Sequence, residues 1–228
     1  RDRNQMQLRA DWYPMSQLTF GAALSFSQDD YPAGFFGLNR SEMLSLTFNL
    51  GYNIDDDLNL SAFINQDRYK NDQSGRSFRG FAPAEAFDPA RNWEMTANDR
   101  FNVFGVSIER ESLRPSFGNW QSERPLDLTF ELKHSRSRGE IDTRVAAGLQ
   151  NAALPELNTR LNVASLSVRY HLSARSSLQM VLEHERYRSS DFALDGVAPD
   201  SIGNVLLLGQ SSPHYQVNWV ALSFRHRF

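Results

Sequence analysis

Apolar and polar residues alternate along most of this chain, in segments separated by turn-forming residues. The alternation is clearest near the C-terminus, where Val220, Leu222 and Phe224 occupy every second position before the chain ends on Phe228. A period of two places the two sets of side chains on opposite faces of a β-strand. The pattern therefore predicts a strand over about 215–228, with one apolar face and a second face of different chemistry.

Eight earlier segments carry the same alternation. In the segment that begins at Leu126, for example, leucine and phenylalanine alternate with Asp127, Thr129, Glu131 and Lys133. Together these segments predict an all-β chain of about nine antiparallel strands. The eight earlier strands are expected at about 5–12, 18–27, 44–52, 58–67, 101–110, 126–133, 164–172 and 178–182.

The connections between these strands alternate between short and long. Short turns are expected near Pro14, Asp56 and Ser176, with a longer member of the same series at 112–124. Long loops are expected at 28–40, 70–98, 136–156 and 189–213. Such loops are unusual in a compact soluble domain, but outer-membrane barrels have short periplasmic turns and long extracellular loops. We therefore predict a transmembrane β-barrel, with Phe228 on the periplasmic side and Arg1 on the outer side.

The predicted number of strands is odd, whereas bacterial single-chain barrels have an even number. The chain also enters a strand pattern almost at Arg1, which is not an initiator methionine. We therefore expect that residues 1–228 are the C-terminal portion of a single transmembrane β-barrel domain, and that further residues precede them.

The composition agrees with this class of protein. No run approaches the roughly 20 apolar residues of a membrane-spanning helix, and the mean hydropathy is −0.51. Strands of about ten alternating residues can still cross a bilayer, so a hydrophilic average does not count against a barrel. A net charge of −3 gives no reason to expect a nucleic-acid partner.

One hairpin is repeated along the chain. When the segment around residues 44–67 is laid on the segment around 162–185 without a gap, Tyr52 matches Tyr170 and Leu60 matches Leu178. This similarity predicts two hairpins of the same construction.

The sequence predicts no catalytic, cofactor-binding or metal site. It contains no cysteine, which excludes disulfides and covalent haem attachment through a C-x-x-C-H motif. No two of the five histidines have the spacing of metal ligands, and Asp55, Asp56 and Asp57 form a solvated acidic turn without the later ligands of a calcium loop. The histidines are His134, His171, His184, His214 and His226.

The aromatic residues near the turns are interpreted as two membrane girdles. One girdle lies near the short turns and the other near the long loops. The first comprises Trp12, Tyr13, Tyr52, Tyr170 and Phe228, and the second comprises Tyr31, Tyr69 and Tyr187.

Several segments resemble the MtrB/PioB family of decahaem-associated outer-membrane proteins. They are DLNLSAFINQDRY, HSRSRGEIDT, ERYRSSDFALDGV, IGNVLLLGQSSPHYQV and the terminal phenylalanine. The resemblance implies a barrel of more than 20 strands that surrounds a periplasmic decahaem cytochrome. It also implies an extracellular multihaem cytochrome on the outer loops, with haem c carried by these partners and not by this chain. Electrons would pass to acceptors outside the cell, as in metal reduction.

Three classes of function remain open from the residues themselves. They are a scaffold that encloses a cytochrome, a passive diffusion porin, and an outer-membrane enzyme such as a lipase. The small residues expected to face inward at 19–27 and 45–51 would let a partner approach the wall closely, but they also suit an open pore. No nucleophile elbow or placed triad supports the enzyme, and only the family resemblance favours the scaffold over the porin.

Overall fold

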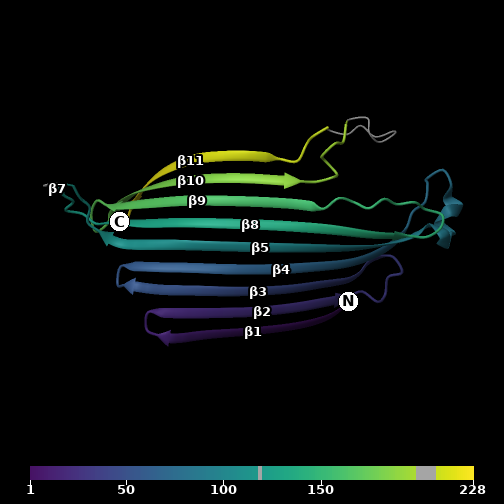
Figure 1. Ribbon diagram of the computed structural model, residues 1–228, viewed down its shortest axis with the longest axis horizontal. Helices are drawn as coiled ribbons and strands as arrows, with labels where there is room; N and C mark the ends of the chain where they lie inside the picture. Colours follow the sequence, from purple (N-terminus) through teal and green to yellow (C-terminus); the bar gives the residue numbers. More distant parts are fainter. Residues whose placement is uncertain (118–119, 199–208) are drawn as a thin grey trace.

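Nine strands form one antiparallel sheet in the computed structural model of the protein, which describes residues 1–117, 120–198 and 209–228 (Figure 1). Their order is β1-β2-β3-β4-β5-β8-β9-β10-β11, so each strand of this sheet pairs with the strands that precede and follow it in the chain. The predicted number of antiparallel strands is confirmed. The strands are β1 (Asp2–Met15), β2 (Leu18–Asp30), β3 (Gly37–Asp55), β4 (Leu58–Arg76), β5 (Asn92–Leu113), β8 (Leu126–Val145), β9 (Leu157–His171), β10 (Ser176–Ser190) and β11 (His214–His226).

The remaining elements are short and lie in the connections. β6 (Ser116–Phe117) and β7 (Trp120–Gln121) form a small ribbon between β5 and β8, while the 3-10 helices η1 (Pro83–Phe87) and η2 (Pro89–Arg91) lie between β4 and β5. No helix within the described ranges is long and apolar enough to cross a membrane.

Short turns and long loops lie at opposite ends of the sheet. The C-terminus lies at the short-turn end and the N-terminus at the long-loop end (Figure 1). The predicted alternation is confirmed: β1–β2, β3–β4 and β9–β10 are joined by tight turns, β5–β8 by the small ribbon, and the other pairs by longer loops.

Three of the long loops are shorter than predicted. The predictions of 28–40, 70–98 and 136–156 are wrong, because the strands continue and leave loops of 31–36, 77–91 and 146–156. Beyond the apolar band, both faces of β2 and β3 are polar and the backbone remains paired, as between Asp30 and Arg40. On β5 and β8 the alternation instead reverses, and apolar residues such as Trp93 and Val145 pair at odd positions. Pairing requires only backbone donors and acceptors. The fourth loop follows β10 at Ser190 and precedes β11 at His214, and its residues 199–208 lie outside the described ranges.

The register places all even-numbered residues on one face through the middle of the strands. This face, the apolar face, carries the predicted apolar residues, and the odd-numbered residues form the polar face. No hydrophobic side chain within the described ranges is buried, so the sheet has no core of its own. One row across the apolar face consists of Phe20, Leu50, Ala62, Val106, Leu132 and Ala164.

The apolar band crosses the strands obliquely. Leu44 is the last large apolar residue of the apolar face of β3 toward the long loops, but its neighbour on β4 is Arg68. On β4 the band ends at Ile64, nearer the short turns, and it steps further in that direction on β8 and β10. A band of constant height needs tilted strands, and the strands of membrane barrels are tilted.

The repeated hairpin is confirmed in its register. Tyr52 pairs with Leu60 in β3–β4, and Tyr170 pairs with Leu178 in β9–β10. The residues of the two turns differ, but the spacing between the paired residues is the same, because turn length fixes hairpin register.

The prediction of a second aromatic girdle is wrong for Tyr69 and Tyr187. Tyr69 and Tyr187 have odd numbers and lie on the polar face, where Tyr187 stacks on Tyr215 with a centroid distance of 5.0 Å. Their position near the long loops suggested a girdle, but the period of two turns them away from the apolar side. Trp12, Tyr52 and Tyr170 of the first girdle lie on the apolar face.

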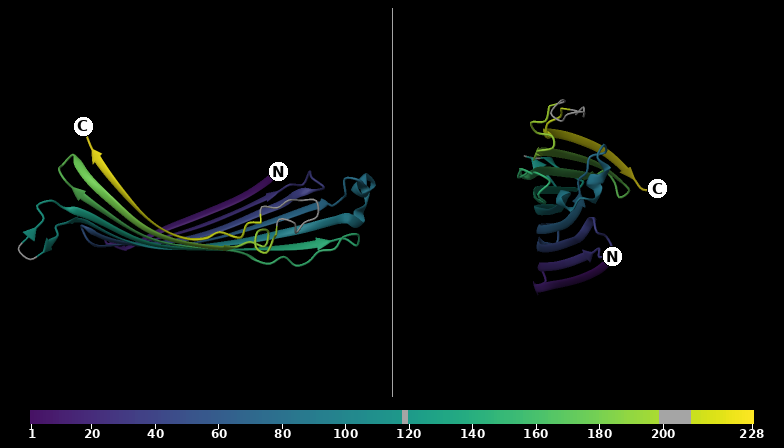
Figure 2. Two further views of the ribbon diagram at one scale, coloured as in Figure 1. Left: turned by 90° about the horizontal axis from the view of Figure 1, so that it is seen from above. Right: turned by 90° about the vertical axis from the view of Figure 1, so that its right-hand side faces the viewer.

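Both edges of the sheet are open. Within the described residues β1 pairs only with β2, and β11 pairs only with β10. The sheet is bowed along its strands and twisted across them (Figure 2).

Arginine substitutions at neighbouring positions of β8 should separate the two faces. Phe130→Arg places a charge on the apolar face and is expected to cost about 2–4 kcal/mol near the middle of a bilayer. Thr129→Arg points to the polar face and should cost less. The measurement is urea unfolding of the full-length barrel in lipid vesicles, and equal costs at both positions would contradict the assignment of faces.

Candidate functional site: the polar face of the sheet

The polar face of the sheet carries side chains of varied chemistry. It carries the odd-numbered side chains of all nine strands of the main sheet, including amides, hydroxyls, carboxylates and arginines. In a membrane barrel the face opposite the lipid-facing one lines the lumen. The polar face is therefore the candidate for contact with anything that the barrel contains.

A band of small side chains runs across the first strands of this face. Thr19 of β2 lies opposite Gly51 of β3, which lies opposite Ser61 of β4. Ser61 in turn shares a hydrogen bond of 2.7 Å with Ser107 of β5. We define the small-residue band as Thr19, Gly21, Ala23, Ser25, Ser45, Thr47, Gly51, Ser61 and Ser107. Only alternate residues of the predicted segments 19–27 and 45–51 belong to it, because their neighbours lie on the apolar face.

Hydrogen bonds fix the polar side chains that border the band. Thr47 donates to Asn65 Oδ1 at 2.7 Å, and Asn65 Nδ2 donates to Asp67 at 2.9 Å. These contacts connect β3 to β4 through side chains as well as backbone. The wall is thereby pre-organised, which lowers the entropy cost of ordering it against a partner.

Gly105 has a specific structural role on this face. The ring of Phe63 on β4 lies directly over Gly105 on β5, so a Cβ at this position would overlap the ring. An aromatic ring that covers a glycine of the neighbouring strand stabilises the strand pair. Gly51 differs, because a Cβ there would meet only Thr19 Cβ, at 3.9 Å.

Acidic and aromatic side chains pair on the last two strands. Trp219 Nε1 donates to Glu183 at 2.8 Å, and the Tyr215 hydroxyl donates to Glu185 at 2.5 Å. The sequence pattern does not single out these residues, although the period of two along β11 places both aromatic rings opposite its apolar side. They give this part of the wall larger and more acidic side chains than the small-residue band.

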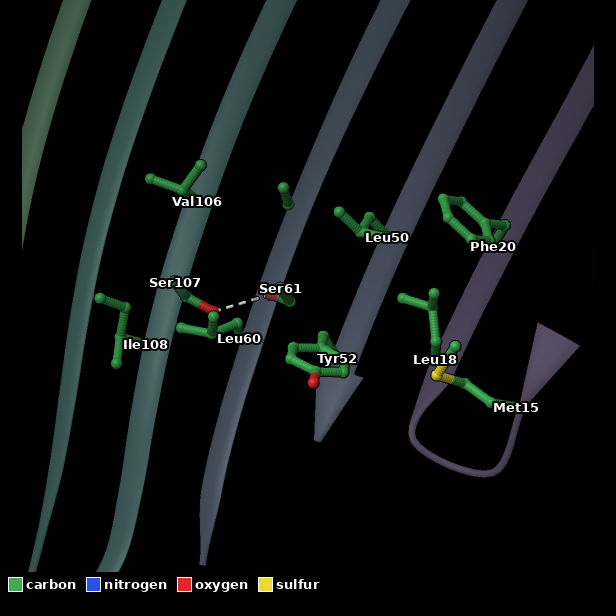
Figure 3. Close-up of a pocket in the computed structure, with 11 residues that line it drawn as sticks. Met15, Leu18, Phe20, Leu50, Tyr52, Leu60, Ser61, Val106, Ser107 and Ile108 are labelled. Atoms are coloured by element: carbon green, nitrogen blue, oxygen red, sulfur yellow. Dashed lines mark hydrogen bonds between the residues drawn. The ribbon is translucent and has the colours of Figure 1, made fainter. Parts of the chain in front are cut away.

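An open groove of about 690 Å³ lies on the opposite, apolar face (Figure 3). Figure 3 shows apolar side chains of β2 to β5 side by side around it, among them Phe20, Leu50 and Ile108. Ser61 and Ser107 also border the groove, but they have odd numbers, and their hydroxyls bond to each other on the polar face. The groove has the chemistry of a surface that contacts hydrocarbon, and we assign no polar ligand to it.

The five histidines are dispersed over the sheet. His171 pairs with Asp127 at 2.7 Å, while His134 and His184 each bond to an asparagine of the next strand. His226 bonds to Ser176, and His214 accepts from the backbone of Ser189. Within the described ranges no three His, Asp or Glu side chains are grouped as metal ligands.

One carboxylate of the acidic turn, that of Asp55, forms an ion pair with an arginine side chain. Asp55 accepts the N–H of Asp57 at 2.9 Å and two contacts of 2.8–2.9 Å from Arg110 Nη1. The backbone hydrogen bond and the guanidinium lower the pKa of Asp55. Because Arg110 already pairs with Asp55, these residues are better explained as a structural turn than as a site that binds a metal cation.

The whole chain matches one protein family. Residues 1–228 match the family described as "Putative outer membrane beta-barrel porin, MtrB/PioB". The chain is also 25% identical, over 227 residues, to outer membrane protein MtrB of Shewanella baltica (strain OS185). This alignment covers 100% of the chain but 30% of that protein, so the chain spans about a third of its relative's length.

Similar solved structures are outer-membrane barrels. The copper transporter OprC has a TM-score of 0.62 at 10% identity, covering 99% of this chain and 34% of that one. The unliganded ferric citrate transporter FecA has a TM-score of 0.52 at 9% identity, covering 99% and 33%. At these identities the likeness shows the fold alone, and it confirms the antiparallel barrel sheet.

Alanine substitutions at two glycines should distinguish the tightly covered position from the open one. Gly105→Ala is expected to destabilise the full-length barrel by about 1–3 kcal/mol, because the new methyl group displaces the Phe63 ring. Gly51→Ala should change stability little, since its Cβ meets only an ordinary contact at 3.9 Å. The measurement is unfolding in urea. If Gly105→Ala left the stability of the barrel unchanged, the packing of the Phe63 ring would not depend on a glycine at position 105.

Proposed function

We propose a function from the premise that this chain belongs to the MtrB/PioB family of outer-membrane β-barrel porins. The barrel to which it contributes encloses a periplasmic decahaem c-type cytochrome and insulates it from lipid. Haems must lie close together across about 30 Å of hydrocarbon, and the polar surface of a cytochrome cannot face lipid. A barrel with an apolar outside and a polar inside solves both problems.

The family match over the whole chain is the observation that carries this proposal. The polar face supports it, because the small-residue band offers a smooth wall that a folded partner can approach closely. The hydrogen bonds of Thr47, Asn65 and Asp67 hold that wall in place before a partner binds. Acidic groups such as Glu183 offer polar contacts at the other end of the sheet.

We propose that residues 1–228 are the C-terminal portion of a single barrel domain with more than 20 strands. The open edges at β1 and β11 support further strands, because unpaired backbone groups are costly in lipid. The width of lumen that a protein partner needs also supports further strands. Eight-stranded barrels are filled by their own side chains, whereas 22-stranded barrels can hold a plug. The coverage of 30% of the relative's length agrees with this size.

The electron carrier belongs to the partner in this proposal. This chain has no cysteine, so haem c cannot be attached to it through a C-x-x-C-H motif. The chain binds no cofactor, performs no catalysis and supplies an insulating wall. Electrons pass through the enclosed cytochrome to acceptors outside the cell.

The long loops support a second partner, an extracellular multihaem cytochrome. Phe35, Phe81 and Phe87 lie in loops at this end and are 96%, 83% and 84% exposed. Exposed aromatic residues are enriched in protein interfaces. Glu85 orders one of these loops: Arg79 holds it by side-chain hydrogen bonds, which lower its pKa to about 2, and Arg91 lies 3.4 Å away.

We propose that the long loops face the cell exterior and that the C-terminus lies on the periplasmic side. The separation of short and long connections supports this orientation, because barrels of this class keep short turns in the periplasm.

A passive diffusion porin is the alternative function. A polar lumen wall suits water and small solutes as well as a protein, and the family description itself includes the word porin. The two functions differ in whether the lumen is occupied, which conductance and copurification both report.

Electron transfer across liposomes tests the scaffold. Liposomes with an internal reduced dye and an external acceptor should transfer electrons only when the full-length barrel and its cytochrome are both present. If the barrel alone admitted small solutes and no haem protein copurified with it, the scaffold would be wrong and the porin would replace it.

A pair of tryptophan substitutions provides the matched control. Ala23→Trp introduces a large ring into the small-residue band and should reduce the haem content of the purified barrel several-fold. Ala22→Trp introduces the same ring on the apolar face, where lipid accommodates it, and should leave the haem content unchanged. Equal haem content in both variants would show that this part of the wall does not contact the partner.

Single cysteines test the orientation. Ala84→Cys in the exposed loop between β4 and β5 should react with an impermeant maleimide on intact cells. Ala174→Cys in the exposed turn between β9 and β10 should react only after the outer membrane is permeabilised. The opposite labelling pattern would reverse the orientation. The loops expected from the sequence also suggest Ser74 and Ser201 as exterior labelling sites. Ser74 is less suitable, because its hydroxyl bonds to Phe35 O and Asn39, and Ser201 lies outside the described ranges.

A further inference from the structure

Seven arginines lie just beyond the apolar band, at its long-loop edge. All have even numbers, so they project from the apolar face and not into the lumen. Six of the seven side chains are exposed, and Arg138 is half-buried. We define this set as the arginine belt: Arg68 on β4, Arg100 on β5, Arg136 and Arg138 on β8, Arg160 on β9, and Arg186 and Arg188 on β10.

The belt brings like charges directly opposite one another. Arg136 of β8 faces Arg160 of β9, which faces Arg188 of β10. A second row joins Arg68, Arg100 and Arg138 across β4, β5 and β8. Like charges directly opposite in a sheet are destabilising. An anion bound between these arginines would offset their repulsion.

The protein supplies few of those anions itself. Arg138 pairs with Glu140 at 2.9 Å and with Glu156. Within the described ranges the other six arginines of the belt have no carboxylate within ion-pair distance, 4.0 Å. At the same edge of β1 to β3 the composition is mixed, and Arg40 pairs there with Asp30 at 3.1 Å and Glu42 at 3.4 Å. The uncompensated charge is thus confined to β4 through β10.

A row of hydrogen-bonded amide and imidazole side chains separates the belt from the apolar band. Gln66 bonds to Asn102 at 3.1 Å, and His134 bonds to Asn162 at 2.7 Å. His184 and Asn218 form a third pair at 2.6 Å. From the band outward the face changes from hydrocarbon to amides and imidazoles and then to guanidinium groups. This sequence of chemistry matches the passage from the bilayer core through its interface to the headgroups.

A hollow in the belt has room for an anionic group. It has a volume of about 210 Å³ and is lined by Arg136, Arg160 and Arg188. Asn158 and Ser190, which are paired in register, also line it. Arginine binds phosphate through two parallel N–H donors, which adds geometric specificity to the charge. Three arginines around one hollow therefore suit a phosphate group.

We propose that the arginine belt binds the phosphate groups of lipopolysaccharide in the leaflet beside the long loops. The site is on the outer wall of the barrel at headgroup level, where a membrane lipid is the adjacent molecule. The outer-membrane location follows from the family. The choice of lipopolysaccharide over a phospholipid rests on the orientation given under the proposed function, which puts the long loops outside.

A lipid-binding measurement on the full-length barrel in detergent tests this proposal. The variant R136Q/R160Q/R188Q removes the arginines of the hollow, and R9Q/R169Q/R225Q removes the same number of charges from the polar face. Lipopolysaccharide, phosphatidylglycerol and inorganic phosphate are titrated separately against the wild-type barrel and both variants. The hollow variant should bind lipopolysaccharide at least about tenfold more weakly, because charge-assisted hydrogen bonds are lost. The polar-face variant should bind like wild type.

Three outcomes would overturn the proposal. Unchanged lipopolysaccharide binding in the hollow variant would show that the belt is not the site. Equal binding of inorganic phosphate would reduce it to a general anion site, and preference for phosphatidylglycerol would remove lipopolysaccharide as the ligand. If the triple variant did not fold, R160Q alone removes the central charge and should still weaken binding measurably. Electron transfer is measured in liposomes that contain no lipopolysaccharide. A failure of the proposed scaffold function would therefore appear in that measurement and not in the lipid-binding measurement.

Discussion

Complete pairing of the backbone is the constraint on which the rest of this structure depends. In hydrocarbon an unpaired N–H or C=O costs several kcal/mol, so strands must be paired along their whole length. The long registers of β3 with β4 and of β4 with β5 meet this requirement, and they continue far past the apolar segments. Since no described hydrophobic side chain is buried, this pairing replaces a core as the source of order.

The same pairing divides the side chains between two environments. Through the middle of the strands, even-numbered residues lie on the lipid side of a barrel wall and odd-numbered residues on the lumen side. On this chain the polar face is uneven: small hydroxyls and glycines lie on β2 to β5, while Glu183 and Glu185 hold aromatic rings of β11. The size and charge of the side chains on the polar face therefore differ between the two ends of the sheet.

At the long-loop edge the side chains of the apolar face change from apolar to polar and then to cationic. The apolar band ends obliquely, hydrogen-bonded imidazole and amide pairs such as His134–Asn162 follow, and arginines come next. The chemistry of a membrane, from hydrocarbon to phosphate, is therefore matched layer by layer on one face. Loops ordered by contacts such as Arg91–Glu85 continue beyond it into water.

The sequence by itself determined the number of strands, their alternation and the alternation of short and long connections, because a period of two and turn chemistry are local properties. It also determined that this chain carries no haem attachment motif, since it has no cysteine. The sequence did not show where the strands end, because pairing such as that of Asp30 with Arg40 continues where the alternation stops. Only the tertiary structure decided the arginine belt: Arg68, Arg100 and Arg138 are far apart in the chain, and register alone brings them into one row.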